Sequence, residues 1–256
     1  MTVGASAACR LLKGGRRDLL LTCDHASRAL PEGYGTLGIS EAELARHIGW
    51  DIGAAALTEA LVATLDAPAV LSGFSRLLVD CNRAPDDPTL VCELSDGTVI
   101  GGNRGLAPEE IARRIERYHT PYHDAIAAQI EAMRRSIEAP AIVSIHSFTP
   151  SMRGRARPWH CGILWDKDPR LAVPLMEKLR AEPGLEVGDN EPYSGKSHVG
   201  YTMARHGASA GLPHVLIEVR QDEIDQPAGV KRWAERLARV LAEIVAEGAP
   251  FRVERY

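Results

Sequence analysis

Short apolar runs alternate with longer amphipathic stretches along the chain, and this alternation constrains the fold more than any other feature. It is typical of an α/β domain in which helices cover a sheet. The predicted strands cover residues 18–23, 69–71, 77–81, 141–145, 161–165, 185–187 and 214–219. The predicted helices cover residues 51–65, 108–137, 169–180, 200–206 and 230–247, and a further one begins at residue 40. We therefore expect a single domain over residues 1–256, with a mixed, largely parallel sheet, helices on both faces and a mobile N-terminal segment over residues 1–16.

Three local signals refine this expectation. Ser40 and Glu43 form a capping box, which predicts a helix start. Asp96 and Gly97 form a dipeptide that favours a tight hairpin within the polar loop that precedes the long helix. Pro121 removes a backbone hydrogen bond from that helix and predicts a bend there.

Composition excludes several classes of protein. Lys and Arg number 30 against 34 Asp and Glu, a net charge of −4, so nothing in the charge balance favours nucleic acid or an anionic membrane as a partner. No apolar run reaches the about 18 residues that a membrane span needs, and no signal-peptide pattern opens the chain, so we expect a cytoplasmic protein. The five cysteines form no CxxC pair, which argues against a disulfide framework or a cysteine zinc site.

Ionisable residues gather where the predicted strands end. His25 follows the first strand, Asn82 and Arg83 follow the strand over 77–81, His146 follows the strand over 141–145, and Glu218 lies in the strand over 214–219. Open α/β sheets place ligands beyond the carboxyl ends of their strands, so we expect these side chains to meet at one edge.

Two imidazoles and a carboxylate form a three-ligand zinc site with a position left open for water. We expect His25 and His146 to be two of the ligands. A further carboxylate can then act as the general base on that water, and Glu218 is the candidate. Arg83 is the candidate for binding an anionic group of the substrate.

Several segments carry a resemblance to known hydrolases. Residues 80–83 (DCNR), 145–148 (IHSF) and 217–220 (IEVR) resemble, in this order, three motifs of zinc carboxypeptidases. More closely, the chain resembles the N-formylglutamate amidohydrolase family over residues 18–225. The segments that carry this resemblance are 24–28 (DHASR), 47–54 (HIGWDIGA), 75–83 (SRLLVDCNR), 118–123 (YHTPYH) and the segments around His146 and Glu218.

The resemblance implies a zinc-carboxypeptidase-like (phosphorylase/hydrolase-like) fold and a metal-dependent amidohydrolase, with Zn²⁺ as the expected metal. The implied substrate is a small anionic N-formyl or N-acyl amino acid, above all N-formylglutamate, which is cleaved to formate and glutamate in histidine degradation. Glu218 would then be the catalytic base. Arg83 and Asn82 would hold the substrate carboxylate, with assistance from Arg76.

The third metal ligand is left open by the motifs. Zinc carboxypeptidases have HxxE at their first zinc histidine, and Arg28 stands in the place of that glutamate. Asp51 is our choice, although an aspartate at a helix start is as often only a cap. Asp24 is the fallback ligand. His123, four residues after His119, lies outside an HExxH motif and is not expected to bind the metal.

Two other functions share these motifs. A carboxypeptidase-like metallopeptidase would use the same residues in an open cleft rather than a closed pocket. A binding protein on a hydrolase fold would bind without turnover, because fold alone does not prove activity. Gly195-Lys196-Ser197 lacks the glycine spacing of a P-loop, and no GxSxG elbow occurs, so neither a phosphate cradle nor a serine hydrolase is expected.

Overall fold

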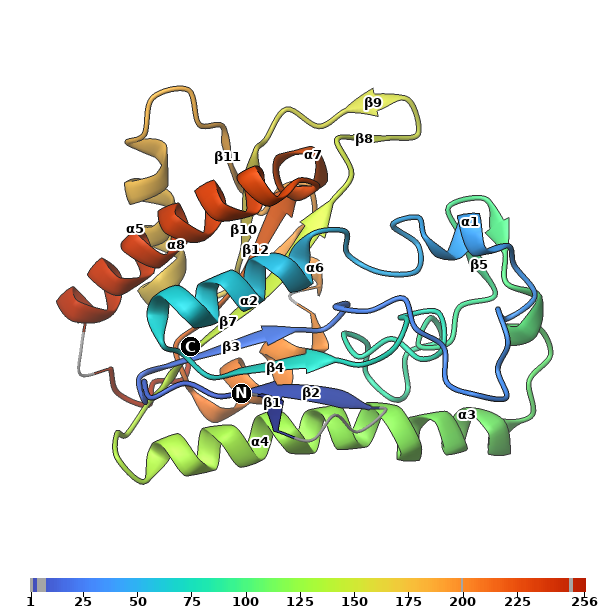
Figure 1. Cartoon of the computed structure of the whole chain (residues 1–256). Coiled ribbons are helices and arrows are strands. Elements are labelled where there is room, and N and C mark those ends of the chain that lie inside the picture. The colour runs from blue at the N-terminus through green and yellow to red at the C-terminus, as the bar shows by residue number, and fades with distance from the viewer. Residues whose placement is uncertain (1, 4–7, 199, 249–250) are drawn as a thin grey trace.

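The computed structural model describes residues 2–3, 8–198, 200–248 and 251–256. Eight strands among these residues form one sheet in the order β1-β2-β4-β3-β7-β12-β10-β11 (Figure 1). In that order the strands are Thr2–Val3, Cys9–Leu12, Ala69–Ser72, Leu19–Cys23, Ala141–Phe148, His214–Arg220, Cys161–Leu164 and Val187–Asp189. Two short hairpins lie outside the sheet and comprise Leu94–Ser95 (β5) with Thr98–Val99 (β6) and Ser151–Met152 (β8) with Arg155–Ala156 (β9).

The centre of the sheet is parallel, and its flanks are mixed. Strands β4, β3, β7 and β12 run in the same direction, whereas β2 is antiparallel to β4 and β10 is antiparallel to β12. Every residue of β3 and β7 is buried, as expected for strands covered on both faces. The predicted mixed, largely parallel sheet is therefore confirmed.

Helices form a layer on each face of the sheet (Figure 1). One layer contains Ala54–Leu65 (α2), Pro169–Arg180 (α5), Gln221–Ile224 (α7) and Pro227–Gly248 (α8). The opposite layer contains Pro108–Arg114 (α3), Thr120–Arg134 (α4), the π-helical turns Ile115–His119 (η2) and Met203–Gly207 (η3), and the 3₁₀ turn Ala208–Ala210 (η4). Alternate strand residues pack into each layer, because neighbouring strand side chains point to opposite faces.

The remaining elements are short. They are Glu41–Leu44 (α1), Gly101–Asn103 (η1) and Gly195–His198 (α6). The Ser40 hydroxyl accepts a hydrogen bond from the Glu43 backbone N–H, so the predicted cap is present, but the helix that it starts ends at Leu44. The predicted hairpin is also present, with Asp96 and Gly97 both at positive φ between β5 and β6.

Pro121 interrupts the long helix at the predicted place. The interruption takes the form of the π-helical turn η2, which ends two residues before Pro121. Proline has no N–H to donate to the previous turn, and its ring crowds the carbonyl there, so a wider turn relieves both problems.

The strand predicted over residues 77–81 is wrong. These residues are buried, but they form turns and extended chain without a sheet partner. Backbone bonds from Leu78 N–H to the Ser75 carbonyl and from Arg83 N–H to the Asp80 carbonyl hold this segment in turns instead. An apolar run reports burial, and a buried loop satisfies that pattern as well as a strand does.

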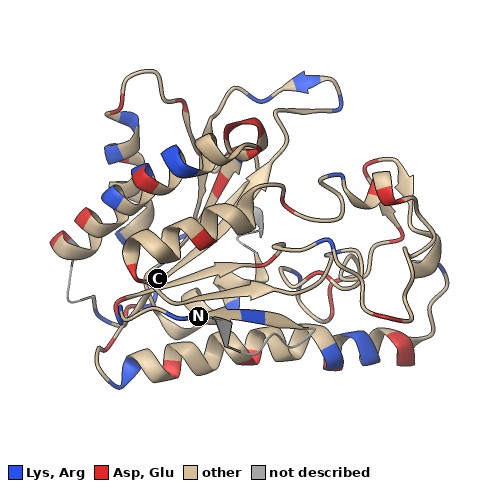
Figure 2. Ribbon diagram, viewed as in Figure 1, with Lys and Arg blue, Asp and Glu red and all other residues tan. Residues whose placement is uncertain are grey.

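Of the N-terminal segment 1–16, residues 1 and 4–7 lie outside the described residues, whereas Cys9–Leu12 forms β2 within the sheet. None of the helices formed by the described residues is long and apolar enough to cross a membrane. Both signs of charge occur along the exposed helices (Figure 2), as in the pairs Lys231–Glu235 and Arg239–Glu243 on α8, at 3.9 and 3.4 Å.

Candidate metal centre

The candidate site lies where three neighbouring parallel strands end. His25 is the second residue after β3, and His146 is the third residue from the end of β7. Glu218, in β12, is the direct neighbour of His146 in the register of the two strands. The carboxyl ends of parallel strands meet at one sheet edge, and the predicted convergence of these three residues is present.

Asp51 lies between the two imidazoles. Its Oδ2 atom is 2.8 Å from His146 Nδ1 and 3.4 Å from His25 Nδ1, and the ligand atoms of the three residues lie within 4.8 Å of one another. Gly53, not Asp51, caps α2, and the cap makes no side-chain hydrogen bond. The alternative in which Asp51 serves only as a helix cap therefore does not describe this structure.

Each imidazole has a second carboxylate behind it. His25 Nε2 lies 2.7 Å from Asp80 Oδ1, and His146 Nε2 lies 2.9 Å from Asp24 Oδ2. A carboxylate on the outer nitrogen fixes the orientation of a ligating imidazole and raises its basicity. Asp24, the fallback ligand of the sequence analysis, therefore faces the far side of His146 rather than the common point of the three residues.

Asp24 is itself held by hydroxyl groups. The Tyr122 hydroxyl donates to its Oδ1 at 2.8 Å and the Thr202 hydroxyl donates to the same atom at 2.6 Å. The Ser144 hydroxyl donates to Oδ2 at 3.1 Å. Together with His146 these bonds keep the pKa of Asp24 well below its usual value although burial alone would raise it.

The charges at this point suit a divalent cation. Burial alone would lower the pKa of His146, but the hydrogen bonds and charges of Asp24 and Asp51 raise it well above the usual value. Without a cation, each imidazole between two carboxylates needs a proton on both nitrogens. With neutral imidazoles, the carboxylates of Asp24, Asp51 and Asp80 against one guanidinium, that of Arg76, leave a formal charge of −2. A divalent cation held by His25, His146 and Asp51 would balance that charge.

Glu218 is the buried carboxylate without a full set of partners. Its residue is 6% exposed, and its Oε2 atom has no hydrogen-bond partner among the described residues. Burial raises the pKa of Glu218 to about 7, and Asp51 adds to the rise against the opposing charge of His146. A carboxyl group with this pKa can both accept and release a proton near neutral pH.

The two arginines predicted to bind substrate are placed differently. Arg76 pairs with Asp80 at 2.8 Å and lies 3.6 Å from Asp51, so its guanidinium is shared among carboxylates of the site. Arg83 lines the same cavity, and its side chain makes no ion pair with any described residue. The charge of Arg83 helps to lower the pKa of Asp80, but without a direct ion pair among the described residues its guanidinium can still contact a ligand.

Asn82 is partly engaged by the protein. Its Oδ1 atom accepts a hydrogen bond from the Thr202 N–H at 3.2 Å, which leaves the amide NH₂ for a ligand. Gly200, at positive φ, packs so closely that a Cβ there would lie 2.5 Å from Asn82 Oδ1, so only glycine fits.

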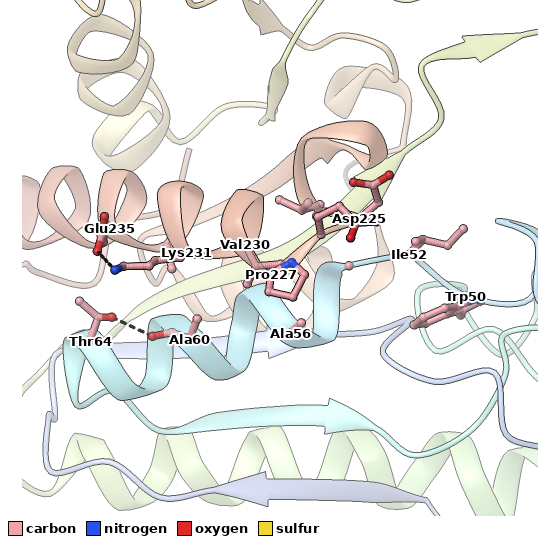
Figure 3. Close-up of a pocket in the computed structure, with 14 residues that line it drawn as sticks. Trp50, Ile52, Ala56, Ala60, Thr64, Asp225, Pro227, Val230, Lys231 and Glu235 are labelled. Carbon is pink, nitrogen blue, oxygen red and sulfur yellow. Dashed lines mark hydrogen bonds and ion pairs between the residues drawn. The ribbon is translucent and has the colours of Figure 1, made fainter.

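All seven residues predicted for the site line one cavity of about 680 Å³. They are joined by Tyr193 and Tyr201, which the sequence analysis did not single out. A second cavity, of about 640 Å³, lies between α2 and α8 with Trp50 and Ile52 at one end (Figure 3). None of the seven predicted residues lines this second cavity, although Trp50 and Ile52 are the chain neighbours of Asp51. The second cavity is therefore separate from the candidate site.

Sequence reasoning missed the supporting roles of Asp80 and Asp24, although both stand next to motif residues. It left His119 and His123 outside the metal site. Among the described residues, the ligand atoms of His25, Asp51 and His146 converge closely enough to hold a metal ion. His119 and His123 are nevertheless buried rather than exposed.

Comparison with known proteins gives a consistent family. The sequence profile of the N-formylglutamate amidohydrolase family matches residues 17–224. A Pseudomonas putida protein named N-formylglutamate deformylase is 24% identical, over 94% of this chain and 96% of its own length. The crystal structure of a gene product from Agrobacterium tumefaciens is 34% identical and superposes with a TM-score of 0.88, over 94% of this chain and 95% of that one. N-formylglutamate amidohydrolase from Ralstonia eutropha shares the fold, with 22% identity and a TM-score of 0.74 over 95% and 100% of the two chains. The chain described here belongs to the N-formylglutamate amidohydrolase family, a family of hydrolases that act on an amide bond.

Proposed function

We propose that this protein is a zinc-dependent amidohydrolase that cleaves N-formylglutamate to formate and glutamate. The observation that carries the proposal is the meeting, in one cavity, of a metal-competent His-Asp-His group, a buried carboxylate with an unpartnered oxygen and an arginine without an ion pair among the described residues. The name of the Pseudomonas putida relative supports the choice of acyl group and amino acid. We further propose that residues 1–256 form one amidohydrolase domain. We also propose that the protein is cytoplasmic and takes part in histidine degradation.

In this proposal His25, His146 and Asp51 hold the metal. Two imidazoles and one carboxylate are ligands that Zn²⁺ takes in catalytic sites, with one position left open. Bound there, the ion would polarise the substrate carbonyl and lower the pKa of a water molecule. Asp80 and Asp24 keep the two imidazoles in place by accepting the N–H of each outer nitrogen.

Glu218 moves the protons. Its unpartnered Oε2 accepts a proton from the attacking water, and the same carboxyl group then donates that proton to the nitrogen of the leaving glutamate. A pKa of about 7 suits both steps, because the group is neither strongly acidic nor strongly basic at neutral pH.

Arg83 binds a substrate carboxylate, and the free NH₂ of Asn82 assists. A guanidinium can make two parallel hydrogen bonds to a carboxylate, which fixes the orientation of the substrate as well as its charge. Arg76 lines the same cavity and assists in binding this carboxylate, although its charge is shared with Asp80 and Asp51.

The test is turnover of N-formylglutamate by the zinc-loaded protein, beside N-acetylglutamate, other N-formyl amino acids and a dipeptide with a C-terminal glutamate. We expect the highest kcat/KM for N-formylglutamate, and loss of activity on chelation with restoration by Zn²⁺. Faster hydrolysis of the dipeptide would instead support the carboxypeptidase-like alternative. Binding of metal and N-formylglutamate without turnover would support the binding-protein alternative.

A further inference from the structure

Three consecutive backbone carbonyl groups in the loop that carries Arg83 are each bound from outside the loop. The Cys81 carbonyl lies 2.9 Å from His123 Nε2, and the Arg83 carbonyl lies 2.9 Å from His119 Nε2. Between them, the Asn82 carbonyl accepts the Tyr201 N–H at 3.2 Å. These bonds satisfy the carbonyl groups of residues 81–83 as a neighbouring strand would, in the loop at the end of the segment that was predicted as a strand.

The carbonyl partners determine where the ring protons lie. A carbonyl oxygen only accepts, so Nε2 carries the proton in both His119 and His123. His123 Nδ1 must then accept, and it lies 3.0 Å from His206 Nε2, which donates to it. Burial lowers the pKa of His123 to about 3 and that of His206 to about 4, so both rings stay neutral at ordinary pH.

The rings also pack against one another. The centroids of His119 and His123 lie 4.5 Å apart, and His123 stacks on His206 with centroids 5.2 Å apart. Tyr201, which lines the cavity, lies over both His119 and His123 at 5.5 and 4.9 Å. The imidazoles therefore form a layer directly beneath the wall of the cavity.

Two of the three imidazoles lie in unusual helical turns, whereas His123 lies in α4. His119 is the last residue of the π-helical turn η2, and His206 lies in the π-helical turn η3. Such turns are rare and occur frequently at functional sites, because they displace a side chain from its ordinary helical position. Pro121 accounts for the first turn, but no proline stands within η3.

The cluster formed by His119, His123 and His206 does not have the geometry of a second metal site. The Nε2 atoms of His119 and His123 are both taken by backbone carbonyls, and the only nitrogen of His123 that remains is bound to His206. What the cluster holds is the short loop whose first residue, Asp80, orients His25 and whose last residue, Arg83, lines the cavity.

We propose that His119 and His123 are positioning residues for substrate binding, which hold the backbone of residues 81–83 so that Arg83 meets the substrate carboxylate. His206 serves the same end by keeping the donor of His123 on Nε2. This inference rests on the proposed function for the identity of the substrate, but the mechanical role of the cluster does not depend on it.

The experiment compares paired variants in the zinc-loaded, full-length protein. His119→Leu and His123→Leu remove the donor, whereas His119→Gln and His123→Gln place an amide N–H where the imidazole Nε2–H was. Met133→Ala, in the buried part of the same helix α4, is a control that weakens packing without touching a carbonyl of the loop. The readouts are kcat and KM for N-formylglutamate, zinc content, and hydrogen–deuterium exchange of the amides of residues 80–84.

We expect each Leu variant to raise KM by about 10-fold to 100-fold, the scale of a small misplacement of a binding group, with a smaller change in kcat. The Gln variants should recover most of the loss, and amides of residues 80–84 should exchange faster in the Leu variants only. Met133→Ala should leave KM unchanged. If His123→Leu does not fold, His119→Leu gives the same comparison.

The two proposals can fail separately. A wild-type protein that turns over no N-formyl amino acid would overturn the proposed function, while faster exchange in the Leu variants and its recovery in the Gln variants would still support the role of the cluster. Unchanged exchange, or faster exchange with an unchanged KM in an active protein, would overturn the positioning inference. A KM that rises equally in Met133→Ala would also overturn it, because loss of stability alone would then be the cause.

Discussion

Glu218 and His146 are direct neighbours on the parallel strands β12 and β7, yet only His146 has a partner for each of its polar atoms. The Oε2 atom of Glu218 has none among the described residues. A buried polar atom without a partner costs about 1–3 kcal/mol of stability. A group kept at that cost beside a metal-competent site is one that a bound substrate or water can complete.

Glu218→Gln should separate a catalytic role from a structural one. The substitution keeps the shape of the side chain but removes the group that accepts the proton, so kcat for N-formylglutamate should fall by about 10²-fold or more. Zinc content and the thermal unfolding temperature should stay close to those of the wild type. A folded, zinc-loaded Glu218→Gln protein with nearly normal kcat would show that Glu218 is not the base.

Metal binding should depend on Asp51 and the two imidazoles more than on Asp24 and Asp80, which contact only the outer nitrogens of the imidazoles. His146→Ala and Asp51→Asn should lose most of the bound zinc, because each removes an atom of the converging group. Asp24→Asn should keep the metal with affinity weakened by about 10-fold to 100-fold, since it removes only the partner of His146 Nε2. Zinc titration of the purified variants measures this order. Equal losses in Asp51→Asn and Asp24→Asn would count against the assignment of Asp51 as the ligand.

Arg83→Lys should weaken substrate binding while the metal stays in place. A lysine supplies the charge but not the paired, planar donors, so KM for N-formylglutamate should rise by about 10-fold or more. Arg104→Lys, at an exposed position directly after η1, is the control and should leave KM unchanged. The assignment fails if the wild-type enzyme cleaves an analogue with amidated carboxylates as efficiently as N-formylglutamate itself.

Two buried histidines should each make a contribution to stability that is lost in mild acid, whereas the raised pKa values of Glu218, His25 and His146 act in the opposite direction over the same pH range. The pKa values of His123 and His206 are about 3 and about 4 in the folded protein, against 6.5 for an ordinary histidine. The unfolded chain therefore takes up protons below pH 6.5 that the folded protein does not. The contribution of each group is complete above pH 6.5 and is lost at about 1.4 kcal/mol per pH unit as the pH falls towards the folded-state pKa.

His206→Gln should remove one of these two contributions. As the pH is lowered from 7.5 to 5, the free energy of unfolding of the wild type, measured with urea, should then fall relative to that of His206→Gln. His160→Gln, at a partly exposed position beside Glu186, is the control. Parallel slopes for His206→Gln and the wild type would contradict the prediction.

The sheet and the convergence of His25, His146 and Glu218 could be predicted because they depend on local patterns. Apolar runs that end in ionisable residues mark buried strands and their exits, and parallel strands bring those exits to one edge. The segment over residues 77–81 does not follow this pattern. Its apolar residues report burial, but the donors that hold its neighbours, the imidazoles of His119 and His123, come from a helix about forty residues away.

The fold class, the family and the residues that meet at the site could all be inferred from the sequence, because strand periodicity, strand ends and short motifs are local properties. Which of two aspartates faces the common point of the imidazoles depends instead on long-range contacts. Asp24 is adjacent to His25 in the chain, yet it lies behind His146, whereas Asp51, remote in sequence from both, lies between them. The direction in which a side chain points depends on partners from other elements, here Tyr122 and Thr202, and those partners are brought together only by folding.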